Sequence, residues 1–471
     1  MTYRQLLKEN ADLRRLWLGQ VVSEIGDWLS SVAVLALAIQ LAGEGREGLA
    51  VAIYAIARHL PLFVFGPLAG VLADRLDRRR VMIRADLLRA LLALGFLLAN
   101  RWASLNAIYL IGASLFAVSA FFNAAKRAAI PNLVRGASAL LTANSLSAST
   151  TAATIAVGSA LGGLIATFAG RNTVFLLNAA TFIFSAEMIR RIISRTQRRE
   201  DVEKKGKQAS AASLRGESGT AGPNGKPEVA ESGSTVSPGV SRAPTRLNIG
   251  LVVRRALDDF REGLRYVRGS RVLSAVFVVA AGWGLGNGVA RALYSVFGAR
   301  LGQSAVAGLV QRPTDFGISV LFVAMGLGGV IGAPIARRFN AGSGHALGSR
   351  MGRSIVFDGC GLALFSLMPN LWGAALVLIA REINFAIWWT AQQTLIMSRT
   401  EDRFGGRVFA SYETLTTLMM LFAMLASGAA ADTYGIKPVA AAGGLVIIIS
   451  GLLWFMLRRR DRSTATHAQR V

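Results

Sequence analysis

Two acidic residues, Glu24 and Asp27, lie three positions apart inside an apolar run that extends from about Trp17 to Leu41. That spacing places both carboxylates on one face of a helix. A charge at membrane depth costs at least about 2.5–3.5 kcal/mol on insertion scales, so such a side chain faces a cavity or a partner. A carboxylate held in this way can exchange a proton, which makes these two acids the first candidates for chemistry.

Arg58 is the expected partner of Asp27. Asp27 stands roughly 15 Å above one end of its apolar run, and Arg58 stands roughly 21 Å above the same boundary in the next run. At comparable depth the two side chains could pair. The pair could be a static ion pair that holds two helices together, or the carboxylate could exchange its arginine partner for a proton in a working cycle. Glu24 is the second candidate for protonation.

The second half of the chain also carries polar residues in the middle of its apolar runs. Burial without a partner would be costly for them too, so they are expected to face a central cavity. They are Arg291, Arg381, Glu382 and Asn384, with Asp358 and, in the first half, Glu187 as weaker candidates. Trp388 and Trp389 are interpreted as an aromatic anchor at the membrane interface.

The elements that must position these residues are membrane-spanning helices. The 471 residues are 53% hydrophobic and 17% charged, with a mean hydropathy of +0.45, which lies outside the range of ordinary soluble domains. Twelve apolar runs are each long enough to cross a hydrocarbon core of about 30 Å. The first run is expected to be retained rather than cleaved as a signal peptide. The runs cover approximately 17–41, 49–72, 82–99, 105–123, 144–168, 174–194, 272–297, 317–336, 353–370, 372–395, 408–431 and 438–457.

The net charge of +25 is distributed unevenly between the loops. Basic residues gather before the first run, after the second and after the fourth, where Lys126 and Arg127 stand, whereas the intervening short loops offer only Arg46, Arg101 and Arg171. By the positive-inside rule both termini are cytoplasmic, and the charge does not indicate nucleic-acid binding. One cysteine and three scattered histidines do not predict a disulfide framework, a metal site or a cofactor.

Residues 195–250 contain no Phe, Trp, Tyr, Met or Cys, and we expect a disordered cytoplasmic linker there. The linker divides the chain into an N-terminal six-helix bundle over 1–194 and a C-terminal six-helix bundle over 251–471. In the C-terminal part, apolar residues recur at helical spacing over 251–268 with arginines between them, which predicts an amphipathic helix on the membrane surface.

The loop GVLADRLDRRR, residues 70–80, resembles the signature loop of the major facilitator superfamily. The fragments LRRLWLGQVVSEIGDW (13–28), NAAKRAAIPNLV (123–134), DFREGLRYVR (259–268) and GGRVFASYETL (405–415) resemble the enterobactin (siderophore) exporter and macrolide efflux branch of that superfamily. The resemblance implies an all-α membrane protein with twelve transmembrane helices in two pseudo-symmetric six-helix bundles.

In the family resembled, the signature loop latches the two halves on the cytoplasmic side. Independently, a carboxylate at a helix C-terminus needs a cation or the positive N-terminus of another helix, and the helix that begins near Arg407 could supply it. The alternative is that these arginines only set the topology. The latch residues implied here are Gly70, Asp74, Arg75, Arg78 and Arg79.

VGSALGGLIA, residues 157–166, resembles the fifth-helix motif of antiporters, with Ser159 at its usual proline position. Gly158, Gly162 and Gly163 would let two helices approach closely, which is equally typical of ordinary helix packing. No Walker lysine motif occurs, so ATP is not the evident energy source.

These patterns together predict a secondary transporter, not an enzyme, in the cell membrane. It would export an amphipathic small molecule, drug-like or siderophore-like, by alternating access coupled to protons, and act as a monomer without nucleic acid. A lysophospholipid or nutrient importer of the same fold, or a non-transporting membrane scaffold or sensor, is the alternative; the mid-span charges in both halves favour transport.

Overall fold

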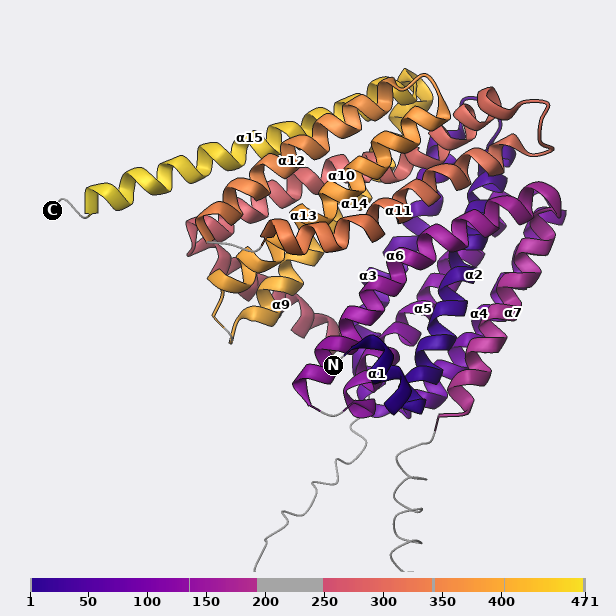
Figure 1. Cartoon of the computed structure of the whole chain (residues 1–471), viewed down its shortest axis with the longest axis horizontal. Helices are drawn as coiled ribbons and strands as arrows, with labels where there is room; N and C mark the ends of the chain where they lie inside the picture. The colour runs from indigo at the N-terminus through magenta and orange to yellow at the C-terminus, as the bar shows by residue number, and fades with distance from the viewer. Residues whose placement is uncertain (1, 135, 193–248, 341–343, 402, 469–471) are drawn as a thin grey trace, which may run out of the picture.

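The computed structural model describes residues 2–134, 136–192, 249–340, 344–401 and 403–468, and these residues form helices joined by short turns (Figure 1). The predicted linker therefore lies, except for its last two residues, outside the described residues. The first group of helices is α1 (Tyr3–Glu9), α2 (Ala11–Ala42), α3 (Glu47–Arg75), α4 (Arg78–Arg101), α5 (Leu105–Leu133), α6 (Ala137–Phe168) and α7 (Arg171–Arg190). The second group is α9 (Ile249–Arg268), α10 (Arg271–Val306), α11 (Pro313–Asn340), α12 (Gly344–Leu367), α13 (Leu371–Arg399), α14 (Gly405–Tyr434) and α15 (Ile436–Ala468).

Short polar side chains set the starts of several of these helices. Asn10 accepts a hydrogen bond from Leu13 N at 2.9 Å before α2, and Asn370 accepts one from Gly373 N at 2.8 Å before α13. Asp77, in the signature loop, accepts from Arg80 N at 2.9 Å and so caps α4. These bonds satisfy amide groups that have no partner within the helix.

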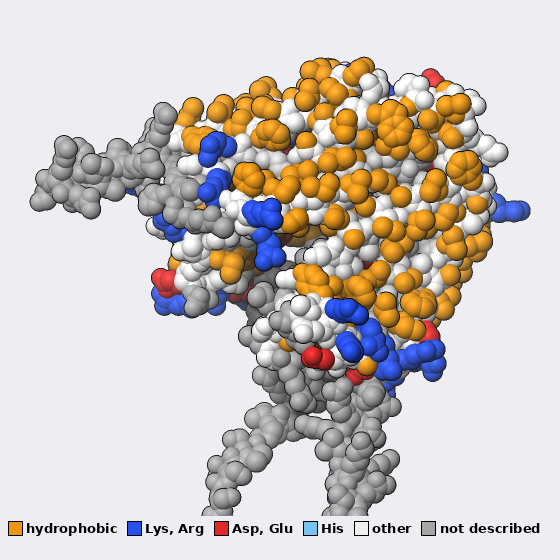
Figure 2. All heavy atoms as spheres, in the orientation of Figure 1, with side chains coloured by type: hydrophobic (Ala, Val, Ile, Leu, Met, Phe, Trp, Pro, Cys, Tyr) orange, Lys and Arg blue, Asp and Glu red, His pale blue; other side chains and the backbone are white. Residues whose placement is uncertain are grey.

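Ten of the described helices are long and apolar enough to cross a membrane: α2, α3, α5, α6, α7, α10, α11, α13, α14 and α15. Two more helices, α4 and α12, are 24 residues long; α4 packs on α5 and α7, and α12 packs on α13 and α15. The expected total of twelve spans therefore depends on these two helices. Hydrophobic side chains cover much of the face seen in Figure 2, and many of the Lys and Arg side chains gather toward its lower end. Many of the exposed large hydrophobic residues are leucines. This pattern matches a protein surrounded by lipid.

Helices α2–α7 pack into one bundle and α10–α15 into another, and the two bundles meet where α3 contacts α10 and α14, and where α11 contacts α2 and α6. Close approach is possible because small residues stand at the contacts. A Cβ atom at Gly48 would lie 2.7 Å from Gly428 O, and one at Gly326 would lie 2.4 Å from Ala156 N. Such positions accept only glycine without a shift of the helices.

The segment 249–268, predicted as an amphipathic helix from residue 251, is helix α9, and α9 packs on α14. Ser411 Oγ of α14 donates a hydrogen bond to Phe260 O at 3.2 Å, and the ring of Tyr266 stacks on Phe404 with centroids 4.5 Å apart. The helix is therefore fixed to the second bundle by specific contacts, besides any contact it makes with lipid.

Candidate functional site

A polar cavity of about 120 Å³ lies inside the first bundle, between α2, α3, α4 and α5. Both acids identified from the sequence, Glu24 and Asp27, line it, together with the cations Arg89 and Lys126. The rest of the lining consists of Gln20, Ser23, Leu62, Phe116, Ser119, Phe122 and Asn123. Two carboxylates and two cations thus share one small space within an otherwise apolar bundle.

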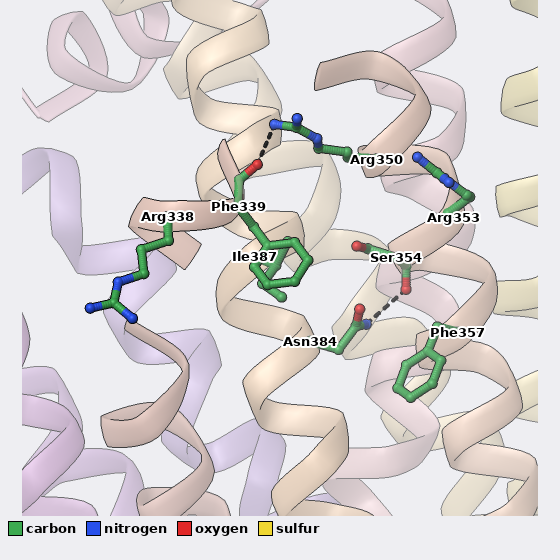
Figure 3. A pocket seen from close by; sticks show the side chains of 8 residues that line it. All are labelled: Arg338, Phe339, Arg350, Arg353, Ser354, Phe357, Asn384 and Ile387. Atoms are coloured by element: carbon green, nitrogen blue, oxygen red, sulfur yellow. Dashed lines mark hydrogen bonds between the residues drawn. The ribbon is translucent and has the colours of Figure 1, made fainter. Parts of the chain in front are cut away.

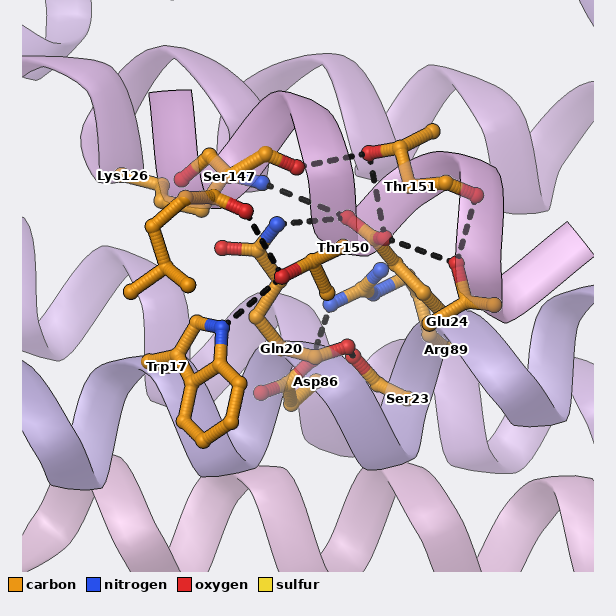
Figure 4. A network of polar contacts seen from close by, with 12 residues as sticks. Trp17, Gln20, Ser23, Glu24, Asp86, Arg89, Lys126, Ser147, Thr150 and Thr151 are labelled. Atoms are coloured by element: carbon orange, nitrogen blue, oxygen red, sulfur yellow. Dashed lines mark hydrogen bonds and ion pairs between the residues drawn. The ribbon is translucent and has the colours of Figure 1, made fainter. Parts of the chain in front are cut away.

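Glu24 is the more strongly bound of the two acids (Figure 4). Gln20 Nε2 donates to Glu24 Oε1 at 2.8 Å, and Lys126 Nζ lies 3.7 Å from the same oxygen. The hydroxyls of Thr151 and Thr154 on α6 lie 3.3 Å and 3.2 Å from Glu24 Oε2. The carboxylate is therefore compensated by a cation and by hydrogen-bond donors from three helices.

The position of Lys126 corrects the sequence reasoning, which counted this residue among the loop charges that follow the fourth apolar run. Helix α5 continues to Leu133, well beyond the end of that run near residue 123, and Lys126 is a part-buried residue within it. A helix continues as long as its backbone hydrogen bonds do, whatever the polarity of its side chains.

Asp27 has a different environment from the one expected. Its carboxylate forms no hydrogen bond or ion pair with any residue that the structure describes, although the side chain is half-buried and lines the cavity. The expected pair with Arg58 is not formed. Instead Arg58 Nη1 donates to Ser31 Oγ at 3.0 Å, and Ser31 Oγ donates to the backbone carbonyl of Asp27 at 2.7 Å.

The reason lies in the aromatic residues around Arg58. Its guanidinium lies 4.7 Å from the ring centroid of Trp28 and 4.9 Å from that of Phe116. Ring faces attract a cation, and a planar guanidinium stacks well on them. Arg58 is thus held by two rings and a serine, which leaves the Asp27 carboxylate facing the cavity.

A second ion pair beside the cavity, in addition to Glu24 with Lys126, was not predicted from the sequence. Asp86 and Arg89 of α4 form a buried ion pair, and the Arg89 guanidinium lies 4.1 Å from the ring centroid of Phe122 and 4.5 Å from that of Phe182. The sequence does indicate this pair, because two charged residues stand three positions apart inside the predicted run 82–99, as Glu24 and Asp27 do in theirs.

In the second bundle, Arg381 is paired with Asp358, a residue that was only a weaker candidate for the central cavity in the sequence analysis. Arg381 Nε lies 2.9 Å from Asp358 Oδ1, and Trp283 Nε1 donates to Asp358 Oδ2 at 3.1 Å. Asn384 Nδ2 donates to Ser354 O at 2.8 Å. These contacts join α10, α12 and α13.

The remaining candidates of the second bundle do not join that pair. Glu382 is half-buried and Arg291 is exposed, and neither forms a hydrogen bond or ion pair with a described residue. Trp388 was expected to anchor the protein at the membrane interface, and that interpretation is wrong. It is 1% exposed and lies against Trp283 with ring centroids 4.3 Å apart, because it fills the interior of the bundle.

The residues of the signature loop contact their own bundle. Arg78 Nη1 donates to Ala128 O at 2.7 Å, and Arg79 donates to Arg190 O. Arg75 is exposed, a Cβ atom at Gly70 would meet no other atom within 4 Å, and the side chain of Asp74 lies outside the described part of the structure.

The loop was expected to meet the N-terminus of the helix that begins near Arg407, which is α14, and the Arg407 side chain of that helix is engaged elsewhere. It bonds to Asp259 at 3.3 Å and to Glu262 at 2.8 Å, both on α9. The latch is therefore not closed across the bundles through Arg407 in this structure.

The two bundles are instead bonded at the opposite end. Arg171 makes two hydrogen bonds to Asp315, at 2.9 Å and 2.7 Å, and a third to Gln40. Arg171 had been counted as a loop charge, yet it is 7% exposed. It stands at the start of α7 and reaches into the contact with α11, so its charge is a structural link between the bundles.

Two further links between the bundles lie at the same end. Asp432 accepts hydrogen bonds from Gly48 N at 2.8 Å and Leu49 N at 2.9 Å, and so caps α3 from the other bundle. Arg300 Nη2 lies 3.1 Å from Glu47 Oε2. Deeper in the molecule, Trp28 meets Phe322 edge to face with centroids 6.0 Å apart. The hydrogen bonds and ion pairs described between the two bundles therefore all lie at the end away from α1 and α9.

The three glycines of the α6 motif face two different helices, α2 of the same bundle and α11 of the other bundle. Cβ atoms at Gly158 and Gly162 would lie 2.7 Å from Ile25 O and 2.6 Å from Leu29 O, so both face α2 within the first bundle. A Cβ atom at Gly163 would lie 2.0 Å from Ser319 Oγ of α11. Only Gly163 therefore stands at the contact between the bundles.

Comparison with known proteins places this arrangement in a family. A family model of the Major Facilitator Superfamily matches residues 16–423. An uncharacterized MFS-type transporter, YfiS, of Bacillus subtilis is 24% identical over 96% of this chain and 94% of its own length. A putative bacilysin exporter of the same organism is 24% identical over 86% of this chain and 85% of its own length.

Solved structures agree on the fold. A bacterial homologue of the human lysosomal transporter Spinster, in an inward-facing and unoccupied conformation, has a TM-score of 0.63 at 13% identity and covers 95% of this chain and 96% of its own. A bacterial homologue of the iron transporter ferroportin, in an inward-facing state, has a TM-score of 0.62 at 14% identity, over 94% of this chain and 98% of its own. This chain is a member of the major facilitator superfamily of membrane transporters.

Proposed function

We propose that this chain exports an amphipathic small molecule, drug-like or siderophore-like, across the cell membrane and couples the export to proton entry through Asp27. The observation that carries the proposal is the cavity in the first bundle, where the Asp27 carboxylate has no direct partner among the described residues while the neighbouring Glu24 is compensated by Lys126. Exporter names among the relatives support the direction of transport.

Alternating access is the mechanism that fits the contacts between the bundles. In this structure the bonds lie at one end, around Arg171 and Asp432, while the signature loop is bonded within its own bundle. We take the bonded end as the extracellular one, because the positive-inside rule puts α1 on the cytoplasmic side. The structure then represents the inward-facing state of a transporter with twelve spans, α4 and α12 included, and with both termini in the cytoplasm.

The coupling step follows from the cost of a bare charge in the bundle. A deprotonated Asp27 beside Arg89 is stabilised while water fills the cavity, and it costs more when the bundles move and exclude that water. A proton on Asp27 removes that cost, so the protonated protein changes between its two conformations more readily. The cationic or polar part of a substrate would compensate the same carboxylate on the return step, which links the two movements in opposite directions.

Flux in proteoliposomes with an imposed proton gradient tests the proposal. The purified chain is assayed against a panel of lipophilic drugs, siderophores and lysolipids, and the substrate that is driven uphill is then used for the variants. Asp27→Asn is expected to abolish uphill transport while it retains downhill exchange, because it removes the titrating group without removing a bonded contact. Arg58→Ala should weaken both, and Glu24→Gln should act more mildly.

Controls separate coupling from folding. Arg84 is exposed on α4 outside the cavity, so Arg84→Gln should behave as the wild type. If Asp27→Asn drives substrate uphill as well as the wild type does at matched protein levels, from about pH 6 to about pH 8, the coupling role belongs to another acid. Uptake of a lysolipid with no export of any compound would instead support an importer of the same fold.

The signature loop is proposed as the latch of the other conformation, with Asp74 and Arg78 as its main residues. A latch biases two states without creating the fold. Asp74→Asn and Arg78→Ala should therefore lower turnover more than the amount of folded protein. Parallel loss of both quantities would mean that the loop, through the bond from Arg78 to Ala128 O, is structural.

A further inference from the structure

A second, larger cavity of about 670 Å³ opens in the second bundle, away from the site described above. It lies between the end of α11, the first turns of α12 and the middle of α13 (Figure 3). Arg338, Arg350 and Arg353 line it, with Ser354 and Asn384 among the polar lining and Phe357 among the apolar lining. No carboxylate lines it in the part of the chain that the structure describes.

None of the three arginines forms an ion pair with an acidic residue in the part of the chain that the structure describes. Arg350 donates to the backbone carbonyl of Phe339, and Arg353 Nε donates to Ser349 O at 3.4 Å. Arg338 forms no hydrogen bond or ion pair with a described residue. A guanidinium has five N–H donors, so most of the donors around this cavity have no partner among the described residues. Elsewhere in the bundle Arg381 and Arg407 each meet a carboxylate, which sets this cluster apart.

The wall beside the arginines is apolar and faces outwards. Phe357 is 53% exposed and Phe339 is 58% exposed, and further along α12 Leu364 is 48% exposed. On a helix surrounded by lipid, such a row of side chains contacts acyl chains. A ligand that suits both features has an anionic head and an apolar tail.

The arginines of the cavity lie where α11 ends and α12 begins, while Asn384 lies deeper, in the middle of α13. Because α10 leads away from α9 and α11 leads back, the end of α11 and the start of α12 are at the same end of the molecule as α9, which is the cytoplasmic end in the orientation proposed above. Anionic lipids enrich the cytoplasmic leaflet, and basic pockets between helices on that side bind their headgroups. Long arginine side chains near helix ends reach the interface in the same way.

We propose that this cavity binds the phosphate of an anionic phospholipid of the inner leaflet, with Arg338, Arg350 and Arg353 as the ligands and Phe357 against an acyl chain. The floor of the cavity is the bond from Asn384 to Ser354 O, and Asn384 lies one turn from Arg381 on α13. A bound lipid would therefore lie against the residues that join α12 to α13. The proposal rests on the proposed orientation and is independent of the exported substrate.

Native mass spectrometry of the full chain in detergent, titrated with dioleoylphosphatidylglycerol or dioleoylphosphatidylcholine, measures the binding. The wild type should bind the anionic lipid and hardly bind the zwitterionic one. The triple variant Arg338→Gln/Arg350→Gln/Arg353→Gln should bind phosphatidylglycerol roughly a hundredfold more weakly, because each basic residue near an anionic lipid contributes about fivefold. The matched control Arg4→Gln/Arg80→Gln/Arg84→Gln removes three exposed charges at the same end and should bind as the wild type.

A charge-preserving triple variant, with lysine at the same three positions, guards against a folding defect and should retain most of the binding. Equal binding by the glutamine triple variant and by its control would overturn the proposal. So would equal binding of the two lipids, or displacement of phosphatidylglycerol by millimolar inorganic phosphate, since the site would then recognise a soluble anion. Failure of these tests would leave the transport proposal standing, because no cavity residue of the first bundle is changed.

Discussion

The ion pair between Arg171 and Asp315 makes the sharpest prediction about conformational change. It joins α7 to α11 across the two bundles through two hydrogen bonds, with side chains 8% and 0% exposed. The substitution Asp315→Asn keeps the shape of the side chain and leaves Arg171 without its counter-charge. The substitution destabilises only the conformation in which this end is closed, because the bond between Arg171 and Asp315 cannot exist once the bundles separate there.

The magnitude follows from the burial of the pair. Removing one partner of a buried ion pair costs about 3–5 kcal/mol. If even about 3 kcal/mol falls on the closed state alone, the ratio of the two conformations changes roughly a hundredfold. A protein that keeps this end closed nearly all of the time would then open it in a large fraction of molecules.

Spin labels on the two short loops at this end measure the change. Arg46→Cys, between α2 and α3, and Leu309→Cys, between α10 and α11, are placed in a Cys360→Ser background, since Cys360 is exposed. Double electron–electron resonance should show a longer, broader distance distribution for Asp315→Asn than for the parent.

Two controls define what the result means. Glu187→Gln removes an exposed ion pair within α7 and should leave the distances unchanged. Arg171→Gln/Asp315→Asn removes both charges and should perturb the distances less than the single variant, because no uncompensated charge is left. If Asp315→Asn gives the parent distribution, the pair is a static link and the reasoning about a gate at this end is wrong.

Three other predictions follow from the contacts and the topology. Gly162→Ala should lower the amount of folded protein, because its methyl group meets backbone of the same bundle, at a cost of about 1–3 kcal/mol that a thermal-unfolding series would detect. Gly163→Ala should leave thermal stability nearly unchanged and lengthen the label distances instead, since its methyl group meets Ser319 of the other bundle; equal loss of stability in the two variants would contradict this division. Tags at both termini and at about residue 220 should report the cytoplasm, and a reporter near Arg46 the opposite side; a shared side for residue 220 and Arg46 would show that the number of spans is wrong.

Much of the fold could be predicted from the sequence because membrane spans leave a direct signal. A helix in lipid needs about 20 apolar residues, and ten of the twelve predicted runs fall within described helices, while the runs 174–194 and 353–370 extend past the ends of α7 and α12. The charges inside those runs could be identified in the same way, since a polar residue at such depth is costly. Glu24 and Asp27 were found by this reasoning, and both line the cavity of the first bundle.

The partners of these charges were decided only by the tertiary structure. Depth along a helix can be counted from the sequence, but the direction in which a side chain points depends on which helices pack beside it and how each is rotated. Arg58 had the right depth for Asp27, yet Trp28, Phe116 and Ser31 hold it elsewhere.

Hydropathy also marks where a helix touches lipid, which is a different quantity from where the helix ends. Lys126 and Arg171 stand outside the apolar runs and were therefore assigned to loops. In the structure Lys126 reaches Glu24 and Arg171 reaches Asp315. Backbone hydrogen bonds carry a helix past the end of its apolar run, and the packing of distant segments then buries charges that the sequence places in loops.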